Sequence, residues 1–131
     1  METTSVKVAF FIYGEHFQPS AITDLLNILP NSTSIKGIIP IGRTRPAVET
    51  MWCIDTGYEK SDDINIQLKK IIGLIQDKED ILNRIRPELN IDMLFDVVIH
   101  LENDEYPVMR LKPDVLKFIA SISADIDFNV Y

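Results

Sequence analysis

Two side chains of complementary chemistry, a carboxylate at Asp96 and an imidazole at His100, stand four residues apart in a segment of alternating polar and apolar residues. A histidine with a carboxylate neighbour can act as a general base or as a metal ligand. In an extended strand, however, four residues span about 13 Å, so the pair needs a third group from another strand, such as Asp127 or Lys7. A polar row on the solvated face of an antiparallel sheet is the alternative that we favour.

Two arginines, Arg43 and Arg45, lie in a turn-like segment between Gly42 and Pro46. A guanidinium group can bind a carboxylate or a phosphate through two parallel hydrogen bonds. The competing explanation is that both side chains are simply solvated on a surface loop. We therefore keep the two arginines as the candidate anion contact of this chain.

The pair Glu15-His16 follows Gly14 at the end of the first predicted strand, a position at which ligand-binding residues do occur. A surface loop explains the pair equally well. We include it in a second hypothesis, in which a small enzyme or ligand-binding protein uses a polar cleft near Glu15, His16, Arg43 and His100.

The sequence offers little support for a metal ion or for covalent catalysis. Two histidines and one cysteine cannot complete the usual closed zinc site, and their spacing matches no metal motif. The carboxylates of Glu102, Asp104 and Glu105 lack the spacing and the central glycine of a calcium loop, so we expect a solvated turn. No nucleotide-binding loop, Gly-x-Ser-x-Gly motif or Cys/His nucleophile pattern is present. We predict no metal and no cofactor, and we favour a protein that is not an enzyme.

Trp52, the single tryptophan, indicates a different kind of site. If the strand registers suit, its face of the sheet carries further rings and apolar groups within a polar border: Phe11, Tyr13, Val98 and Tyr131, surrounded by Asp96, His100, Asp127 and Asn129. Aromatic anchors inside a polar rim are typical of a protein interface or of an apolar ligand groove. The alternative is that the rings pack under a loop or under the helices. The candidate binding residues are Tyr13, Trp52, Arg43, Arg45, Asp96, His100 and Tyr131.

Helices and strands that position these residues are predicted by the hydrophobic periodicity. The longest helical pattern runs over 61–86, with Ser61 as the N-cap and Pro87 as the stop signal. Polar residues interrupt its apolar stripe, so we expect a bend or break over 76–80. Shorter helices are predicted to begin at Pro19 and at Pro113.

Alternation of apolar and polar residues predicts most of the strands. We expect strands at 6–13, 48–56, 91–102 and 126–131, an edge strand or extended loop at 35–41, and a hairpin whose second strand is 107–111. The last strand is expected to be paired inside the sheet. This order of elements predicts a single α+β domain over residues 1–131, with a mainly antiparallel sheet and helices packed on one face, ferredoxin-like or an elaboration of it.

Composition limits the class of partner and the compartment. The 131 residues, of which 46% are hydrophobic, suit one soluble globular domain. Thirteen basic and twenty acidic residues give a net charge of −7, which disfavours nucleic acid and anionic membranes as partners. Cys53 is the single cysteine and cannot form an internal disulfide, and the sequence shows no targeting signal or membrane span. We therefore expect a cytoplasmic protein.

Several short groups of residues occur in a characteristic order along nearly the whole chain. They are Tyr13-Gly14, then Phe17, Pro19, Ile22, Thr23, Leu25, Leu26, Ile28 and Pro30, then Trp52, Ser61-Asp62-Asp63, Pro107, Leu111 and the ending 124–131. In these residues the chain resembles the bacterial domain of unknown function 4279 family, and it departs from the family pattern between Ser34 and Val48. The resemblance implies a small bacterial cytoplasmic protein, and it carries no established activity, cofactor or catalytic residue.

Our leading hypothesis is a non-enzymatic protein-interaction module that binds through the aromatic sheet face around Trp52. Its partner would be another protein or a second copy of the chain, which would make a homo-oligomer. Because many short, acidic bacterial domains are interaction or immunity proteins, the hypothesis includes an immunity-type role. The competing hypothesis is the enzyme or ligand-binding protein with the polar cleft described above.

Overall fold

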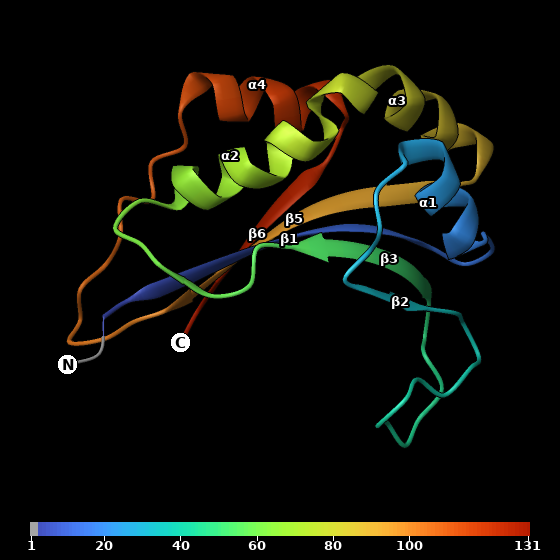
Figure 1. The fold of residues 1–131 in the computed structure, drawn as a ribbon, viewed down its shortest axis with the longest axis horizontal. Coiled ribbons are helices and arrows are strands. Elements are labelled where there is room, and N and C mark those ends of the chain that lie inside the picture. The colour runs from blue at the N-terminus through green and yellow to red at the C-terminus, as the bar shows by residue number, and fades with distance from the viewer. Residues whose placement is uncertain (1–2) are drawn as a thin grey trace.

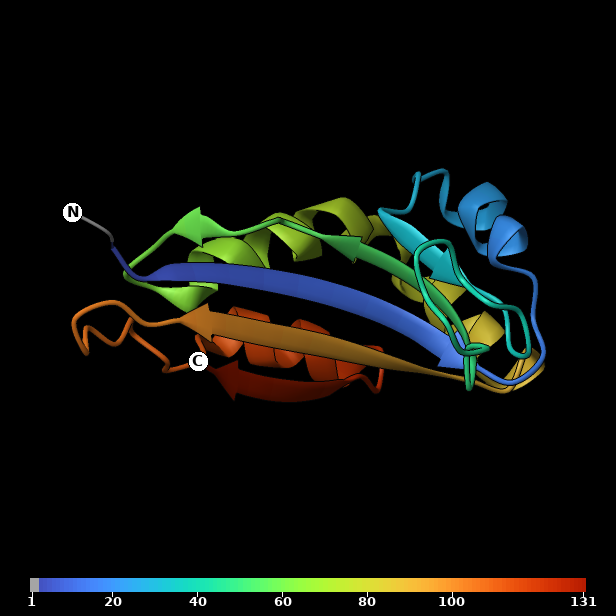
Figure 2. The ribbon, with the colours of Figure 1, turned by 90° about the horizontal axis from the view of Figure 1, so that it is seen from below.

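In the computed structural model, which describes residues 3–131, one twisted sheet carries its helices on one face (Figure 1). In chain order the elements are β1 (Ser5–Gly14), α1 (Pro19–Leu26), β2 (Ser32–Ser34), β3 (Thr50–Asp55), β4 (Glu59–Lys60), α2 (Ile64–Ile75), the 3-10 helix η1 (Gln76–Lys78), α3 (Glu79–Glu88), β5 (Ile91–His100), α4 (Pro113–Ser121) and β6 (Asp125–Val130). Figure 2, seen from below, shows the strands in front of the helices, so the other face of the sheet is left open. The predicted α+β class, with helices on one face, is confirmed.

The strands lie in the order β2-β3-β1-β5-β6, and β4 extends the β3 side by pairing with the start of β1. β1 is antiparallel to both of its main neighbours, β3 and β5, whereas β5 and β6 are parallel. The sheet is therefore mainly antiparallel, as predicted. This order differs from a minimal ferredoxin-like sheet, because the central strand β1 has antiparallel neighbours on both sides and the parallel pair lies at an edge.

β1 and β5 form the centre of the sheet and pair along their whole lengths, from Ser5 opposite His100 to Gly14 opposite Ile91. Alternate side chains of both strands point toward the helices and are buried: Val6, Val8, Phe10 and Ile12 of β1 with Ile91, Met93, Phe95, Val97 and Ile99 of β5. The rings of Phe10 and Phe95 lie 4.9 Å apart, centroid to centroid. Apolar burial of this kind is the main source of stability, so the core lies between this face and the helices.

The long helix predicted over 61–86 is divided into α2, η1 and α3. The break falls at Gln76–Lys78, inside the predicted interval, where the apolar stripe is interrupted. The N-cap prediction was wrong by two residues, since Asp63 caps α2 through a 2.9 Å hydrogen bond from the Asn65 amide to Asp63 Oδ1. Pro87 does not stop α3, which ends at Glu88, and Asn90 in the left-handed conformation (φ 52°) turns the chain into β5.

The predicted hairpin at 107–111 was wrong. Val108 bonds instead to the segment that precedes α2: its N–H donates to the Asp62 carbonyl over 2.7 Å, and its carbonyl accepts from the Ile64 N–H over 3.1 Å. Residues 101–112 therefore cross to the helical layer rather than returning along β5. β6 pairs with β5, and it forms an edge of the sheet rather than an interior strand.

The segment 35–49, which we call the arm, is a loop and not a strand; β2 covers only Ser32–Ser34 before it. Two backbone hydrogen bonds of 2.9 Å join its legs, from Gly37 N–H to the Ala47 carbonyl and from Ala47 N–H to the Ile38 carbonyl. Gly37 and Gly42 have positive φ values of 85° and 79°, which favour glycine at the bends. The arm hangs below the sheet on the side opposite the helices (Figure 1).

Candidate functional site

Trp52 was predicted to lie on the docking face, and this prediction was wrong. Its register places it beside Ile12 and Thr33 on the helix-facing side of the sheet, where it is 0% exposed. The indole Nε1 donates a 3.0 Å hydrogen bond to Thr23 Oγ1 of α1. Burial of an indole is favourable when the ring is shielded from water and its N–H has a hydrogen-bond acceptor, and this position provides both. Trp52 is therefore a core residue.

The open face nevertheless carries a continuous row of apolar groups in the middle of the sheet. Across the strands, Cys53, Phe11 and Leu94 lie side by side and end at Asp125. In the neighbouring set, Met51 and Tyr13 lie side by side and end at Asp92. Phe11, Tyr13, Met51 and Leu94 are each half-buried, although no helix covers them. Phe11 and Tyr13 were predicted to share a face with Trp52, and this grouping was wrong, because they lie on the open face together with Met51 and Leu94.

The arm overhangs this face and makes a groove with it of about 1260 Å³. We call this space the groove; its floor is Phe11, Tyr13, Met51, Leu94 and Asp96, and its wall is the arm with both predicted arginines. Aliphatic side chains of the arm are strongly exposed to water: Ile38 at 58%, Ile39 at 55%, Ile41 at 105% and Val48 at 85%. Exposed apolar groups gathered next to an apolar floor are typical of a binding surface.

Carboxylates border the floor on the β5 and β6 side. Asp96 lies beside Asp127 in the parallel register, and Asn129 Nδ2 donates a 2.7 Å hydrogen bond to Asp96 Oδ1. Burial raises the pKa of Tyr13, and the carboxylates of Asp92 and Asp125 raise it further. Because several negative charges act on one phenol, this side of the open face has a negative potential that favours cationic groups.

Asp96 and His100 lie on the open face as predicted, but the structure gives them different neighbours. His100 Nε2 lies 3.8 Å from the Glu102 carboxylate, and its ring lies 6.5 Å from the ring of Tyr58. Lys7 places its ammonium group 4.9 Å from the centre of the same tyrosine ring. The two residues are therefore no dyad.

Tyr131 ends the chain next to β6 and is 73% exposed. Its N–H donates to the Ile99 carbonyl over 2.8 Å, and its carbonyl accepts from Leu101 over 2.9 Å. Alternation from Asn129 places its side chain on the open face, at the end of the sheet away from the arm. Tyr131 and His100 thus extend the open face beyond the groove.

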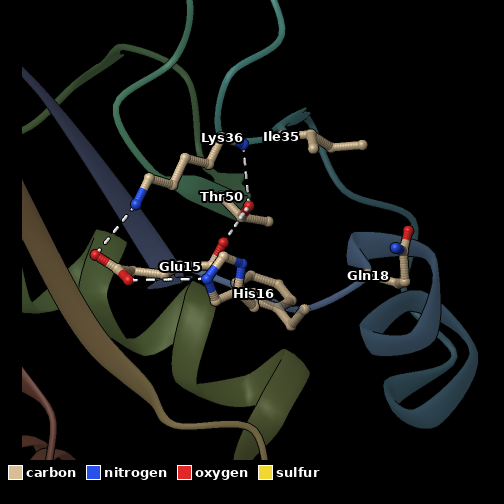
Figure 3. Close-up of a pocket in the computed structure, with 7 residues that line it drawn as sticks. Glu15, His16, Gln18, Ile35, Lys36 and Thr50 are labelled. Carbon is tan, nitrogen blue, oxygen red and sulfur yellow. Dashed lines mark hydrogen bonds and ion pairs between the residues drawn. The ribbon is translucent and has the colours of Figure 1, made fainter.

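The second hypothesis uses Glu15, His16, Arg43 or His100 in a polar cleft at a sheet edge, and the structure does not bring all four residues together. Glu15 and His16 line a smaller cavity of about 380 Å³ near the start of α1. There the Glu15 carboxylate lies between Lys36 Nζ at 3.2 Å and His16 Nε2 at 3.9 Å (Figure 3). His100 is opposite Ser5, nine residues of β1 away from Gly14, which is about 30 Å along the strand.

Both ionisable side chains of this smaller cavity are largely in water, at 68% exposure for Glu15 and 87% for His16. Buried Thr50 organises the backbone beneath them, since its hydroxyl donates to the Glu15 carbonyl over 3.2 Å and accepts from the Lys36 N–H over 3.1 Å. Among residues 3–131, no group of three or more His, Cys, Asp or Glu side chains is arranged to hold a metal ion. A search of the same residues finds no helix with the length and hydrophobicity needed to cross a membrane.

Sequence reasoning missed Met51, Leu94 and the exposed isoleucines of the arm. The signal for Leu94 was available, because strict alternation on 91–102 places it on the same face as Asp96. The signal for the arm was the run of aliphatic residues between Gly37, Pro40 and Gly42, which cannot be buried by a regular strand.

The fold and the site together define a small α+β protein with a bare, partly aromatic sheet face and an overhanging arm. The family model described as Domain of unknown function (DUF4279) matches residues 3–131, so the chain belongs to this family. Comparisons with curated proteins and with solved structures gave no match.

Proposed function

We propose that this chain is a non-catalytic protein-interaction module that binds its partner in the groove between the open sheet face and the arm. One observation carries the proposal: an apolar floor that no helix covers lies next to the exposed aliphatic side chains of the arm. The apolar floor residues are Phe11, Tyr13, Met51 and Leu94. Interface cores are built from aromatic and aliphatic anchors, and charged groups lie at their rims. The groove has this anatomy.

The distribution of ionisable groups supports binding over catalysis. A general acid or base must lie within hydrogen-bond reach of the proton that it transfers, and active sites gather such groups with their orienting partners in one cleft. Here Asp96 accepts a hydrogen bond from Asn129, and His100 lies beside Glu102. Glu15 and His16 lie in a separate cavity, and both are largely exposed to solvent. The carboxylates that do gather near Tyr13 suit the recognition of a cationic surface.

The proposal is tested with Leu94→Lys, which places a charge in the floor of the groove. The matched control is Leu116→Lys on α4, where the side chain is 48% exposed on the helical layer. Proteins captured from an extract of the source cells by the unmodified chain should also be captured by the control. A central anchor residue contributes enough that its loss should weaken binding by about 30-fold or more.

Hydrogen exchange of the captured complex then locates the contact. We expect slower exchange in the arm, in β5 and in the exposed part of β6, with unchanged exchange in the helices. Equal capture by Leu94→Lys and by the control, with both variants folded by circular dichroism, would contradict the proposal. An immunity-type role, in which the partner is a toxin, is one form of this function and would be recognised by the identity of the captured protein.

A further inference from the structure

We infer that the partner in the groove is a second copy of this chain, and that two copies place their arms on each other's open faces. The inference rests on the proposed function, because it uses the same surface and names its occupant. Three observations carry it: the two halves of the surface are complementary in charge, they lie on opposite sides of the central strand, and the chain exposes more surface than its size requires.

Complementarity is present within one molecule. The arm presents two exposed arginines, Arg43 and Arg45, among its exposed isoleucines. The floor on the β5 and β6 side presents the exposed carboxylates of Asp92, Asp125 and Asp127 next to apolar groups. Arginine forms bidentate pairs with carboxylates, and the isoleucines fit an apolar floor. Each half of the surface is therefore a suitable partner for the other half of a second copy.

The order of the strands allows two copies to place their arms on each other by a two-fold rotation. The arm follows β2 and leads into β3, on one side of the central strand β1, whereas the carboxylates lie on β5 and β6 on its other side. Figure 2 shows the arm in front of the sheet, running from the β3 side across the end of β1, with β6 at the opposite edge. A two-fold axis along β1 lays the arm of each copy over the carboxylate side of the other. Two-fold interfaces need such a self-complementary patch, and they close without leaving a free half.

The chain exposes more surface than a compact monomer of its mass is expected to expose. The chain exposes 7909 Å², whereas a compact monomer of 15.0 kDa is expected to expose about 7,000 Å². The excess of roughly 900 Å² means that the chain is less compact than an average monomer of this mass. The projecting arm contributes to this excess, since Ile41 is 105% exposed and Val48 is 85% exposed.

A cationic peptide is the main competing occupant, and it explains less of the surface. Such a peptide would neutralise the carboxylates beside Tyr13, but its positive charges would offer no carboxylate partner to Arg43 and Arg45, which line the same groove. A second copy covers the floor and the arm in the same event. For this reason the observations favour self-association over a peptide ligand.

Sedimentation equilibrium of the whole chain, from micromolar to millimolar concentration, gives the first test. We expect a species of twice 15.0 kDa at high concentration. Arg43→Glu/Arg45→Glu should weaken this dimer by about 100-fold or more, because two-fold symmetry repeats each repulsive contact. The matched control is Arg84→Glu/Lys117→Glu, which makes the same change in net charge on exposed helical positions and should leave the dimer intact.

Charge exchange gives the second test. Asp92→Lys/Asp125→Lys should weaken the dimer as strongly as the arm variant does. An equimolar mixture of the arm variant and the face variant should form a heterodimer, because the glutamates of one arm meet the lysines of the other face and the second contact is unmodified. This rescue cannot arise from general loss of folding.

A chain that remains monomeric at millimolar concentration would overturn the inference. A dimer that ignores both charge variants, but is lost when the β6 edge is altered, would overturn it as well. If the monomer still captures a different protein in a Leu94-dependent manner, this inference fails and the proposed function stands. If capture is also independent of Leu94, both fail.

Discussion

The indole nitrogen of Trp52 lies 3.0 Å from the hydroxyl oxygen of Thr23 and donates a hydrogen bond to it. The contact joins the middle of β3 to Thr23, the fifth residue of α1, and the tryptophan ring is fully buried. Thr23 Oγ1 is in turn 3.5 Å from the Pro19 carbonyl, within the same helix. Trp52 thus helps to hold α1 on the helix-facing side of the sheet.

Replacing Trp52 with alanine should destabilise the domain rather than its binding surface. The lost burial and the remaining cavity should lower the free energy of unfolding by about 3–5 kcal/mol. Thr23→Val should lower it by about 1–3 kcal/mol, because the indole N–H would keep no acceptor. Urea unfolding followed by circular dichroism measures both changes.

Tyr131→Ala is the control for this comparison, because that ring is 73% exposed. It should change the free energy of unfolding by no more than about 0.5 kcal/mol. If Trp52→Ala unfolds at the urea concentration of the unmodified chain, the packing role assigned to Trp52 is wrong.

The error at Trp52 shows what alternation can and cannot predict. The sequence places Thr50, Trp52 and Ile54 on one face of a strand, and the structure agrees. It does not say which face meets the helices, because the other face also carries apolar residues, Met51 and Cys53. That choice is made by the pairing of Trp52 with Ile12, a contact between residues forty positions apart.

Local patterns were sufficient where the structure is local. The break near Gln76 was predicted because polar residues interrupt one helical stripe, and the placement of Asp96 and His100 on the open face follows from one strand. The prediction of a hairpin at 107–111 was wrong because Val108 forms hydrogen bonds with the residues on either side of Asp63. These residues are more than forty positions away, so local sequence patterns do not indicate the contact. The groove could not be predicted from local patterns, since its floor joins side chains of β1, β3 and β5 and its wall is the irregular arm.

Asn65 is expected to be sensitive to the loss of its amide. Its Nδ2 group donates over 2.8 Å to both Asp63 Oδ1 and the Arg110 carbonyl, and its Oδ1 accepts from the Lys112 N–H over 3.0 Å. The side chain is only 3% exposed. Asn65→Asp keeps the size and shape of the side chain but replaces the amide group that donates two hydrogen bonds with a carboxylate oxygen that faces two other oxygens. We therefore expect the free energy of unfolding to fall by about 3 kcal/mol.

Urea unfolding near neutral pH measures the cost of Asn65→Asp. Asn83→Asp serves as the comparison, because Asn83 Nδ2 makes one such bond, to the Ser121 carbonyl over 2.9 Å, and is less buried. Asn65→Asp should be the more harmful change. Equal stability of the two variants would show that the contact between α2 and the segment before α4 contributes little.

Asp63 gives the domain an acid-dependent contribution to stability. Hydrogen bonds from the Asn65 side chain and backbone amide hold the pKa of the Asp63 carboxyl below its usual value. A lowered pKa in the folded state adds stability above the unfolded pKa of about 3.9, and this stability is lost as the pH falls through the folded pKa. Unfolding measured from pH 6 down to pH 2 should therefore show this loss in the unmodified chain.

Asp63→Asn keeps an N-cap but removes the titrating group, so its stability should fall less steeply below about pH 4 than that of the unmodified chain. Asp63→Ala removes the cap itself and should cost about 1 kcal/mol near neutral pH. Parallel pH profiles for the unmodified chain and Asp63→Asn would show that Asp63 is not the group responsible.

The thiol of Cys53 should be inert while the domain is folded. Burial, together with the nearby Asp55 carboxylate, raises its pKa to about 11, although a hydrogen bond with Ser32 partly opposes this rise. Because the thiolate is the reactive form and the side chain is only 3% exposed, reaction with a thiol reagent near pH 8 should be at least about 100-fold slower than in concentrated urea. Absorbance of the released aromatic thiol gives both rates.

Cys53→Ala/Leu116→Cys is the control, because its exposed thiol on α4 should react rapidly without urea. If Cys53 of the folded, unmodified chain reacts at a rate close to that of the control, then β3 opens far more readily than the burial of Cys53 indicates.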